Sequence, residues 1–208
     1  MTVEEKDLQA WVDEAAERLE VPGVSVGVYS AGQEHYAFHG VTSIENPLPV
    51  DEHTLFQFGS TGKTFTATAI MRLVEQGKVS LDERVRTYIP ELKLQDEDVA
   101  REVRVLNLLN HTAGWQGDLE IDTGDGDDAL AKYIEEKMPE FNQDTPLGAT
   151  VTYNNASLSL AGRVIEKVTG LTFEQAIKEL IFEPLGLKST YFFMNDIMTR
   201  RFVAGHRQ

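Results

Sequence analysis

Cysteine is absent from this sequence of 208 residues. Its absence excludes disulfide bonds, thiolate nucleophiles and cysteine-ligated zinc sites, because each of these needs a thiol. The redox compartment stays undetermined. Any covalent catalysis must therefore be carried by a serine or a carboxylate.

Long hydrophobic runs and positive charge are also scarce. No segment approaches the roughly 18 consecutive apolar residues of a membrane span, and residues 1–8 are acidic rather than a basic leader. With no signal peptide visible, the cytoplasm is the default expectation for its location. The formal net charge of -15 argues against nucleic acid and anionic membranes as partners, because both would repel the chain.

The composition that remains is typical of a soluble globular domain. Hydrophobic residues make up 41% and charged residues 25% of the chain, so it can bury one sizeable core. We therefore expect residues 1–208 to form a single domain.

Hydrophobic periodicity predicts the first elements. Apolar residues at helical spacing predict a helix over residues 4–20, which Pro22 and Gly23 end. Two short β-rich runs, residues 24–29 and 35–38, are separated by a polar, glycine-containing turn and predict an antiparallel hairpin.

The middle of the chain is predicted to be mostly helical. A helical pattern begins at Ser60 and ends at Gly77, and two more patterns cover residues 158–168 and 173–182. Residues 117–128 are acidic and contain glycine, which predicts an exposed loop, and a mostly helical stretch follows it. The tail from residue 191 has a β-rich start and no clear end signal.

Ser60 and Lys63 form the first candidate catalytic pair. They stand three residues apart at a predicted helix start, where side chains at i and i+3 share one face. The lysine amine can then accept the serine proton, and the helix dipole and backbone amides can stabilise a negatively charged oxygen. Alone, this spacing is equally typical of a capping serine and a solvated lysine.

Tyr153, Asn154 and Asn155 add the groups that such a pair would need. The phenol can relay a proton, and an amide can bind a substrate carbonyl or the lysine. Alone, this triplet is also typical of a turn.

Three blocks occur together in this chain: Phe-Gly-Ser-Thr-Gly-Lys at 58–63, Leu-Leu-Asn-His-Thr-Ala-Gly at 108–114, and Tyr-Asn-Asn at 153–155 followed by residues 160–170. In order and separation they resemble the serine β-lactamase-related family, which includes class C β-lactamases, penicillin-binding proteins, D-alanyl-D-alanine carboxypeptidases, D-aminopeptidases and related esterases. The likeness extends over residues 21–205, and three concordant blocks are far more specific than any one.

The resemblance implies an α+β fold of the β-lactamase and transpeptidase type, with helices packed on an antiparallel sheet and a helical subdomain over about residues 80–180. It implies that Ser60 forms an acyl-enzyme, that Lys63 and Tyr153 share general base and acid duties, and that Asn155 orients the substrate. The implied substrates are β-lactams, D-amino-acid peptides or esters. No metal or organic cofactor is implied.

Other expectations concern residues near these blocks. The backbone amide of Ser60 is expected to be one oxyanion donor. Trp115 is expected to line the entrance of the cleft or to pack in the interior. His111 lies in a structural loop of the family, and we expect a hydrogen-bonded loop histidine rather than a catalytic one.

The chain departs from the family at two places. The third family motif, a Lys or His followed by a small residue and Gly, has no convincing copy after Tyr153, because His206 is followed by Arg207. That strand normally supplies the second oxyanion amide, so we expect the chain to be truncated or a fragment whose C-terminal strands are missing. Leu158 stands where many relatives have an aromatic residue, which affects substrate details only.

Other functions stay open. A catalytically silent scaffold that binds a ligand or partner is the main alternative, and a homo-oligomer is a further option. A phosphate-binding loop is disfavoured because Gln57 replaces the required glycine. A calcium loop from Asp118 is disfavoured because Thr123 and Ala129 stand where glycine and glutamate are needed.

Overall fold

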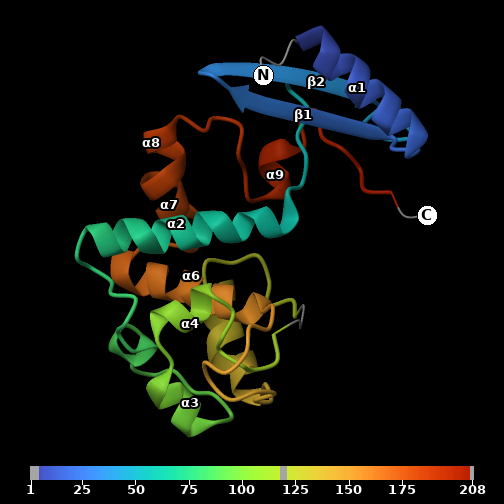
Figure 1. Ribbon diagram of the computed structural model, residues 1–208. Coiled ribbons are helices and arrows are strands. Elements are labelled where there is room, and N and C mark those ends of the chain that lie inside the picture. Colours follow the sequence, from blue (N-terminus) through green and yellow to red (C-terminus); the bar gives the residue numbers. More distant parts are fainter. Residues whose placement is uncertain (1–4, 118–120, 207–208) are drawn as a thin grey trace. The chain divides into compact units, whose positions relative to one another are not determined.

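The computed structural model of the chain describes residues 5–117 and 121–206 (Figure 1). It divides into two compact units. The first extends to Phe58 and is completed by the segment that begins at Tyr191, and the second comprises Gly59–Thr190.

The first unit contains the predicted helix and hairpin. Helix α1 (Glu5–Arg18) is followed by strands β1 (Gly23–Ser30) and β2 (Gln33–Gly40), which pair antiparallel. The two residues between the strands, Ala31 and Gly32, have φ angles of 52° and 82°. Two positive φ values in a two-residue connection are the geometry of a type I′ turn, which matches the twist of the strands. Both sequence predictions are confirmed.

Helix α1 packs on one face of this hairpin (Figure 1). Leu8 and Val12 on the helix are buried against Ala37 of β2, and the β1 valines at 24, 26 and 28 pack around them. The valines are two residues apart because alternate side chains of a strand point to the same face. The apolar stripe of the helix therefore covers one face of the two-stranded sheet.

Gln9 also connects α1 with β2, through its amide. Its Nε2 donates to the carbonyl of Phe38 at 2.9 Å, and its Oε1 accepts from the N–H of Phe38 at 3.1 Å. One side chain thus hydrogen-bonds both backbone polar groups of a strand residue, as a neighbouring strand would.

The β-rich start of the tail is not matched by a strand within the described residues. Helix α9 (Met194–Ile197) follows it, and Phe202 makes a single isolated bridge with Leu55. Phe192 and Phe193 remain 43% and 44% exposed. A β-rich run is stabilised by a half-buried pleated surface, which these side chains lack here.

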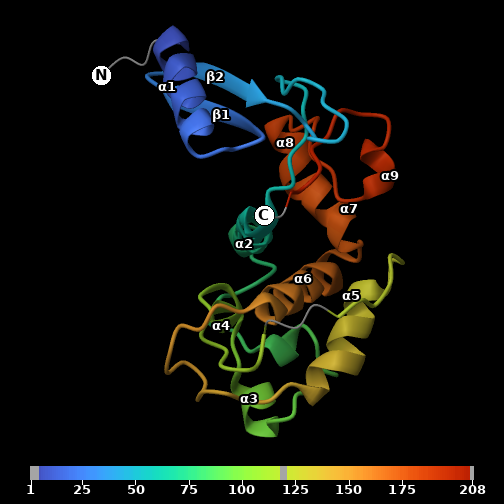
Figure 2. The ribbon, with the colours of Figure 1, turned by 90° about the vertical axis from the view of Figure 1, so that its right-hand side faces the viewer.

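The second unit is helical, as predicted. Helices α2 (Gly62–Glu75) and α6 (Asn155–Thr169) lie side by side in Figures 1 and 2 and share its core. Their fully buried side chains include Ile70 and Leu73 on α2 and Leu160 on α6. The shorter helical segments are the 3-10 turns Gly59–Thr61, Val85–Thr87 and Met138–Glu140, helices α3 (Glu97–Glu102), α4 (Val105–Leu109), α5 (Ala129–Lys132), α7 (Phe173–Ile177) and α8 (Glu183–Leu185), and the π-helical turns Tyr133–Lys137 and Lys178–Phe182.

A buried carboxylate joins α6 to α7. Glu166 is 6% exposed, accepts from Arg163 Nη1 at 2.8 Å and accepts from the backbone N–H of Phe173 at 3.1 Å. A buried charge is tolerated when it is paired and hydrogen-bonded in this way. The polar positions in the 160–170 block therefore have a structural role.

The acidic loop is confirmed over residues 121–128, whereas Gly117, the first residue of the predicted loop, is buried. Residues 121–128 contain no helix or strand and are mostly exposed. Residues 118–120, where the disfavoured calcium loop would begin, lie outside the described residues. The limits predicted for a single domain and for a helical subdomain stay predictions.

Candidate active site

The site is built on the start of α2. Gly59 has a φ of 50°, a left-handed conformation that glycine adopts without steric cost, and the 3-10 turn Gly59–Thr61 then leads into the helix at Gly62. Ser60 stands in this turn and is exposed. The positive end of the α2 dipole is therefore close to the Ser60 hydroxyl.

The structure brings Lys63 to Ser60. The side chain of Lys63 is partly buried, and its Nζ donates to Ser60 Oγ at 3.0 Å. This is the contact predicted from the i and i+3 spacing.

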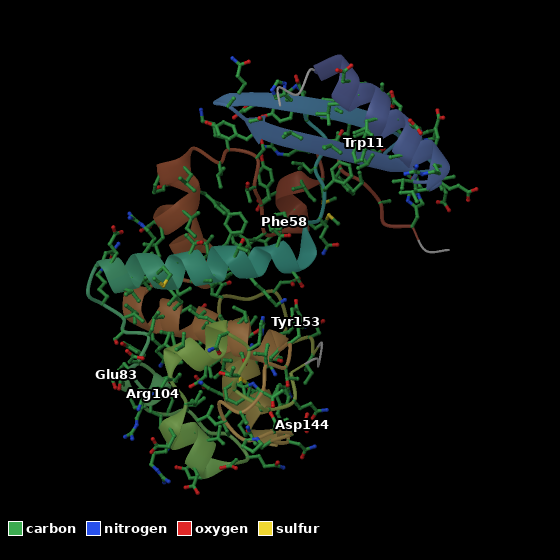
Figure 3. All side chains as sticks on the ribbon, in the orientation of Figure 1. Trp11, Phe58, Glu83, Arg104, Asp144 and Tyr153 are labelled. Atoms are coloured by element: carbon green, nitrogen blue, oxygen red, sulfur yellow. The ribbon has the colours of Figure 1, made fainter. Side chains whose placement is uncertain are left out.

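Tyr153 completes the cluster from a distant part of the sequence. Its Oη lies 2.5 Å from Ser60 Oγ, although the two residues are 93 positions apart, and either oxygen can be the donor. Lys63 Nζ lies 4.7 Å from the centroid of the Tyr153 ring. Figure 3 shows Tyr153 on the side of α2 that faces α6. One serine oxygen thus contacts both an amine and a phenol.

Asn154 anchors the segment that presents Tyr153. Its side chain is 2% exposed and caps α6, since Oδ1 accepts from Ser157 N at 2.7 Å and from Ser157 Oγ at 2.8 Å. Its Nδ2 donates to the carbonyl of Trp115 at 2.6 Å. The start of α6 is thereby fixed to the loop that follows α4.

Gly117 makes this close approach feasible. A Cβ at position 117 would lie 1.8 Å from Asn154 Nδ2, so only glycine fits. The carbonyl of Gly117 also accepts from the N–H groups of Asn155 and Ala156, at 3.0 and 3.2 Å. The loop therefore satisfies N–H groups at the start of α6 that have no partner within the helix.

His111 contacts the same segment on both sides of Tyr153. Its carbonyl accepts from Thr152 N at 2.8 Å, and its Nδ1 accepts from Asn154 N at 3.1 Å. Its ring lies 4.9 Å from the Tyr153 ring, centroid to centroid. Burial, and then the positive charge of Lys63, lower the pKa of His111 below its usual value. The predicted hydrogen bonding of this loop histidine is confirmed, and its lack of a catalytic role stays a prediction.

The remaining predicted site residues lie beside the cluster. Asn155 is the first residue of α6 and is partly buried. Trp115 is 3% exposed and belongs to the core, and its indole Nε1 has no hydrogen-bond partner among the described residues. For both residues, contact with a substrate stays a prediction.

Sequence reasoning missed the structural roles of Asn154 and Gly117. A capping signal was present, because Asn154 stands three residues before Ser157 at the start of an apolar helical pattern. No comparable signal marks Gly117. A side chain is excluded there because the Asn154 side chain, from a distant segment, occupies the space that a Cβ would need.

The described parts of the chain hold neither a cluster of metal ligands nor a membrane-spanning helix. There, no three or more His, Asp or Glu side chains gather as ligands for a metal ion. Nor does any helix within those ranges have the length and apolar character needed to cross a bilayer.

Comparison with known proteins places this geometry in a family. A family model described as Beta-lactamase matches residues 8–208. The chain belongs to the β-lactamase family. This result confirms the resemblance inferred from the three sequence blocks and, with it, the β-lactamase and transpeptidase type of fold.

The relatives of this β-lactamase-family chain include proteins named penicillin-binding protein and proteins named β-lactamase. It is 34% identical over 186 residues to penicillin-binding protein 4 of Amycolatopsis lactamdurans and 32% identical over 189 residues to a β-lactamase of Providencia stuartii. These alignments cover 89% and 91% of this chain, but 49% and 47% of the relatives. The chain therefore spans about half the length of the curated relatives it matches.

A solved structure shows the same likeness. The octameric penicillin-binding protein homologue from Pyrococcus abyssi is 29% identical and superimposes with a TM-score of 0.79. The match covers 97% of this chain and 47% of that one.

Proposed function

We propose that this chain carries the acylating half of a serine hydrolase site, in which Ser60 attacks the carbonyl of a β-lactam, a D-amino-acid peptide or an ester. The observation that carries the proposal is the position of Ser60 Oγ, 2.5 Å from Tyr153 Oη and 3.0 Å from Lys63 Nζ. Both atoms are within hydrogen-bonding reach of Ser60 Oγ, which proton transfer requires. The names of the curated relatives support the same chemistry.

The proposed reaction has two steps. In the first, Ser60 Oγ forms a bond to the substrate carbonyl carbon while its proton passes to the Tyr153 and Lys63 pair, in the form in which one of the two has already lost a proton. The pair returns the proton to the leaving group as the bond between carbonyl and leaving group breaks. In the second step, water attacks the acyl carbon of the ester at Ser60 and loses its proton to the same pair. The bond from that carbon to Ser60 Oγ then breaks, the acid leaves, and the pair returns the proton to the serine oxygen.

The surroundings of Ser60 suit this role. Ser60 is exposed, and Tyr153 is 50% exposed, so a substrate can reach the oxygen. The α2 dipole favours negative charge at its start, by up to about 2 kcal/mol in a partly buried site. We propose the backbone amide of Ser60 as one oxyanion donor, and Asn155 and Trp115 as substrate contacts.

Labelling with a fluorophosphonate tests the proposal. Intact mass spectrometry should show a single adduct on the wild-type chain and none on Ser60→Ala. Ser25→Ala, at an exposed position of β1, is the matched control and should be labelled as the wild type is. An adduct that survives in Ser60→Ala would contradict the assignment of the nucleophile.

A catalytically silent scaffold is the second candidate function. It is kept beside the first because the residues that follow Tyr153 in this sequence contain no copy of the third family motif. His206, the nearest approach to that motif, accepts from the N–H of Ile44 through Nε2 at 3.1 Å. Folded protein without an adduct would favour this second function over the first.

A further inference from the structure

We propose that His111 is a positioning residue for Tyr153 and that its imidazole Nδ1 holds the phenol at Ser60. This inference rests on the proposed function, because it assigns a role in the same site. It also goes beyond the loop role expected from the sequence, since it assigns the role to the side chain.

The first argument is the arrangement of hydrogen bonds around Tyr153. The residues immediately before and after it, Thr152 and Asn154, both donate their backbone N–H to His111, one to its carbonyl and one to its Nδ1. One hydrogen bond on each side of Tyr153 restrains its backbone dihedrals and hence the direction of its Cα–Cβ bond. The imidazole supplies one of these two hydrogen bonds.

The second argument is the contact between the rings. The His111 ring lies 4.9 Å from the Tyr153 ring and is inclined to it by 32°. Aromatic pairs are attractive at centroid distances of about 4.5–7 Å. The His111 ring therefore lies against the half-exposed side chain of Tyr153 and limits the side-chain rotamers that the phenol can adopt.

The third argument is the protonation state that this geometry requires. An Nδ1 that accepts a hydrogen bond carries no proton, so the neutral ring holds its proton on Nε2. Within the described residues, Lys63 and Tyr153 are the titratable groups whose charge or ring contact reaches His111. A protonated imidazole would lose the acceptor and would add a second positive charge near Lys63, so the neutral form is the one that positions Tyr153.

The backbone at His111 offers a matched pair of variants. Its φ is 59°, a conformation that asparagine and glycine tolerate better than other residues do. His111→Asn keeps an acceptor at the place of Nδ1, because Oδ1 of asparagine is also bonded to Cγ. His111→Gly removes the acceptor and the ring without strain at this φ.

The rate of fluorophosphonate labelling at Ser60 separates these variants. We expect His111→Gly to be labelled about 100-fold more slowly than the wild type, because small displacements of a reacting group have effects of this size. We expect His111→Asn to recover the rate to within about five-fold, since it lacks only the ring contact. A wild-type rate in the glycine variant, or an equal loss in both variants, would overturn the role of Nδ1.

A spectroscopic measurement on the unmodified chain keeps the inference independent of catalysis. The 15N chemical shifts of the His111 ring at neutral pH should show an unprotonated Nδ1 and a protonated Nε2. A proton on Nδ1 would refute the inference even if the glycine variant failed to fold. If the wild type is never labelled, the proposed function fails, whereas a proton on Nδ1 would overturn the inference on its own.

Discussion

Tyr153 is the residue that joins the two halves of the proposed mechanism. It contacts Ser60 through Oη, and its ring lies near both Lys63 and His111. A phenol in this position can take the serine proton directly or pass it to the lysine. Its half-exposed side chain contributes little to the core, which makes it suitable for a conservative substitution.

Tyr153→Phe should separate catalysis from stability. The variant loses only Oη, so we expect fluorophosphonate labelling of Ser60 to slow by about 10²–10⁴-fold, the usual contribution of general acid–base catalysis. Tyr29→Phe, at a residue that is 76% exposed in the other unit, is the control and should leave the rate unchanged. Equal rates for Tyr153→Phe and the wild type would remove the phenol from the mechanism.

At the scale of elements, α6 matters because its start carries Tyr153. The helix is held to the loop after α4 by the side chain of Asn154 and by the carbonyl of Gly117. Displacement of the helix start would therefore also displace the phenol.

Asn154→Ala should weaken this connection measurably. It removes the cap of α6 and leaves the buried carbonyl of Trp115 without this donor, so we expect the free energy of unfolding to fall by about 2–4 kcal/mol. Unfolding in increasing concentrations of urea measures this free energy. Asn46→Ala, at an exposed site, should change it by less than about 0.5 kcal/mol. Similar values for both variants would contradict the anchoring role.

The sequence predicted the elements better than the contacts between them. Hydrophobic periodicity predicts α1, the hairpin and α2, because each depends on local spacing and on turn residues such as Gly32. The Ser60 and Lys63 contact follows from helix geometry. The hydrogen bond between His111 and Asn154 spans 43 positions and depends on a positive φ at a histidine, which no local pattern indicates.

The whole molecule contains two tryptophans, one in each unit. Trp115 is 3% exposed, whereas Trp11 is 64% exposed. In a Trp11→Phe background the fluorescence of Trp115 therefore reports the unfolding of the Gly59–Thr190 unit. The unfolding measurements on variants of the candidate site are therefore made with Trp11→Phe present.

His111 should make the stability of the molecule depend on pH with a definite sign. Burial, and then the Lys63 charge, lower its pKa below the usual 6.5, so the unfolded chain binds this proton more readily than the folded chain does. The contribution to stability is complete above about pH 6.5 and is lost as the pH falls toward the lower pKa of the folded state.

The free energy of unfolding, followed by Trp115 fluorescence, should therefore decrease between about pH 7 and pH 5. His111→Asn should show a smaller decrease, because it has no titrating group there. The carboxylates of Asp13 and Glu91 also have lowered pKa values, caused first by side-chain hydrogen bonds with His39 and Lys167, but their usual values are 3.8 and 4.5, so their effect begins at lower pH. The same slope in both proteins would show that His111 does not titrate in this way.

The pairing of Gln9 with Phe38 restricts how the sheet can grow. Exposed strand edges are templates on which further strands, from the same chain or another, assemble by backbone hydrogen bonding. A helix side chain already occupies that template on β2. A strand added along β2 would therefore have to displace Gln9 at Phe38, so the glutamine protects this edge at that position.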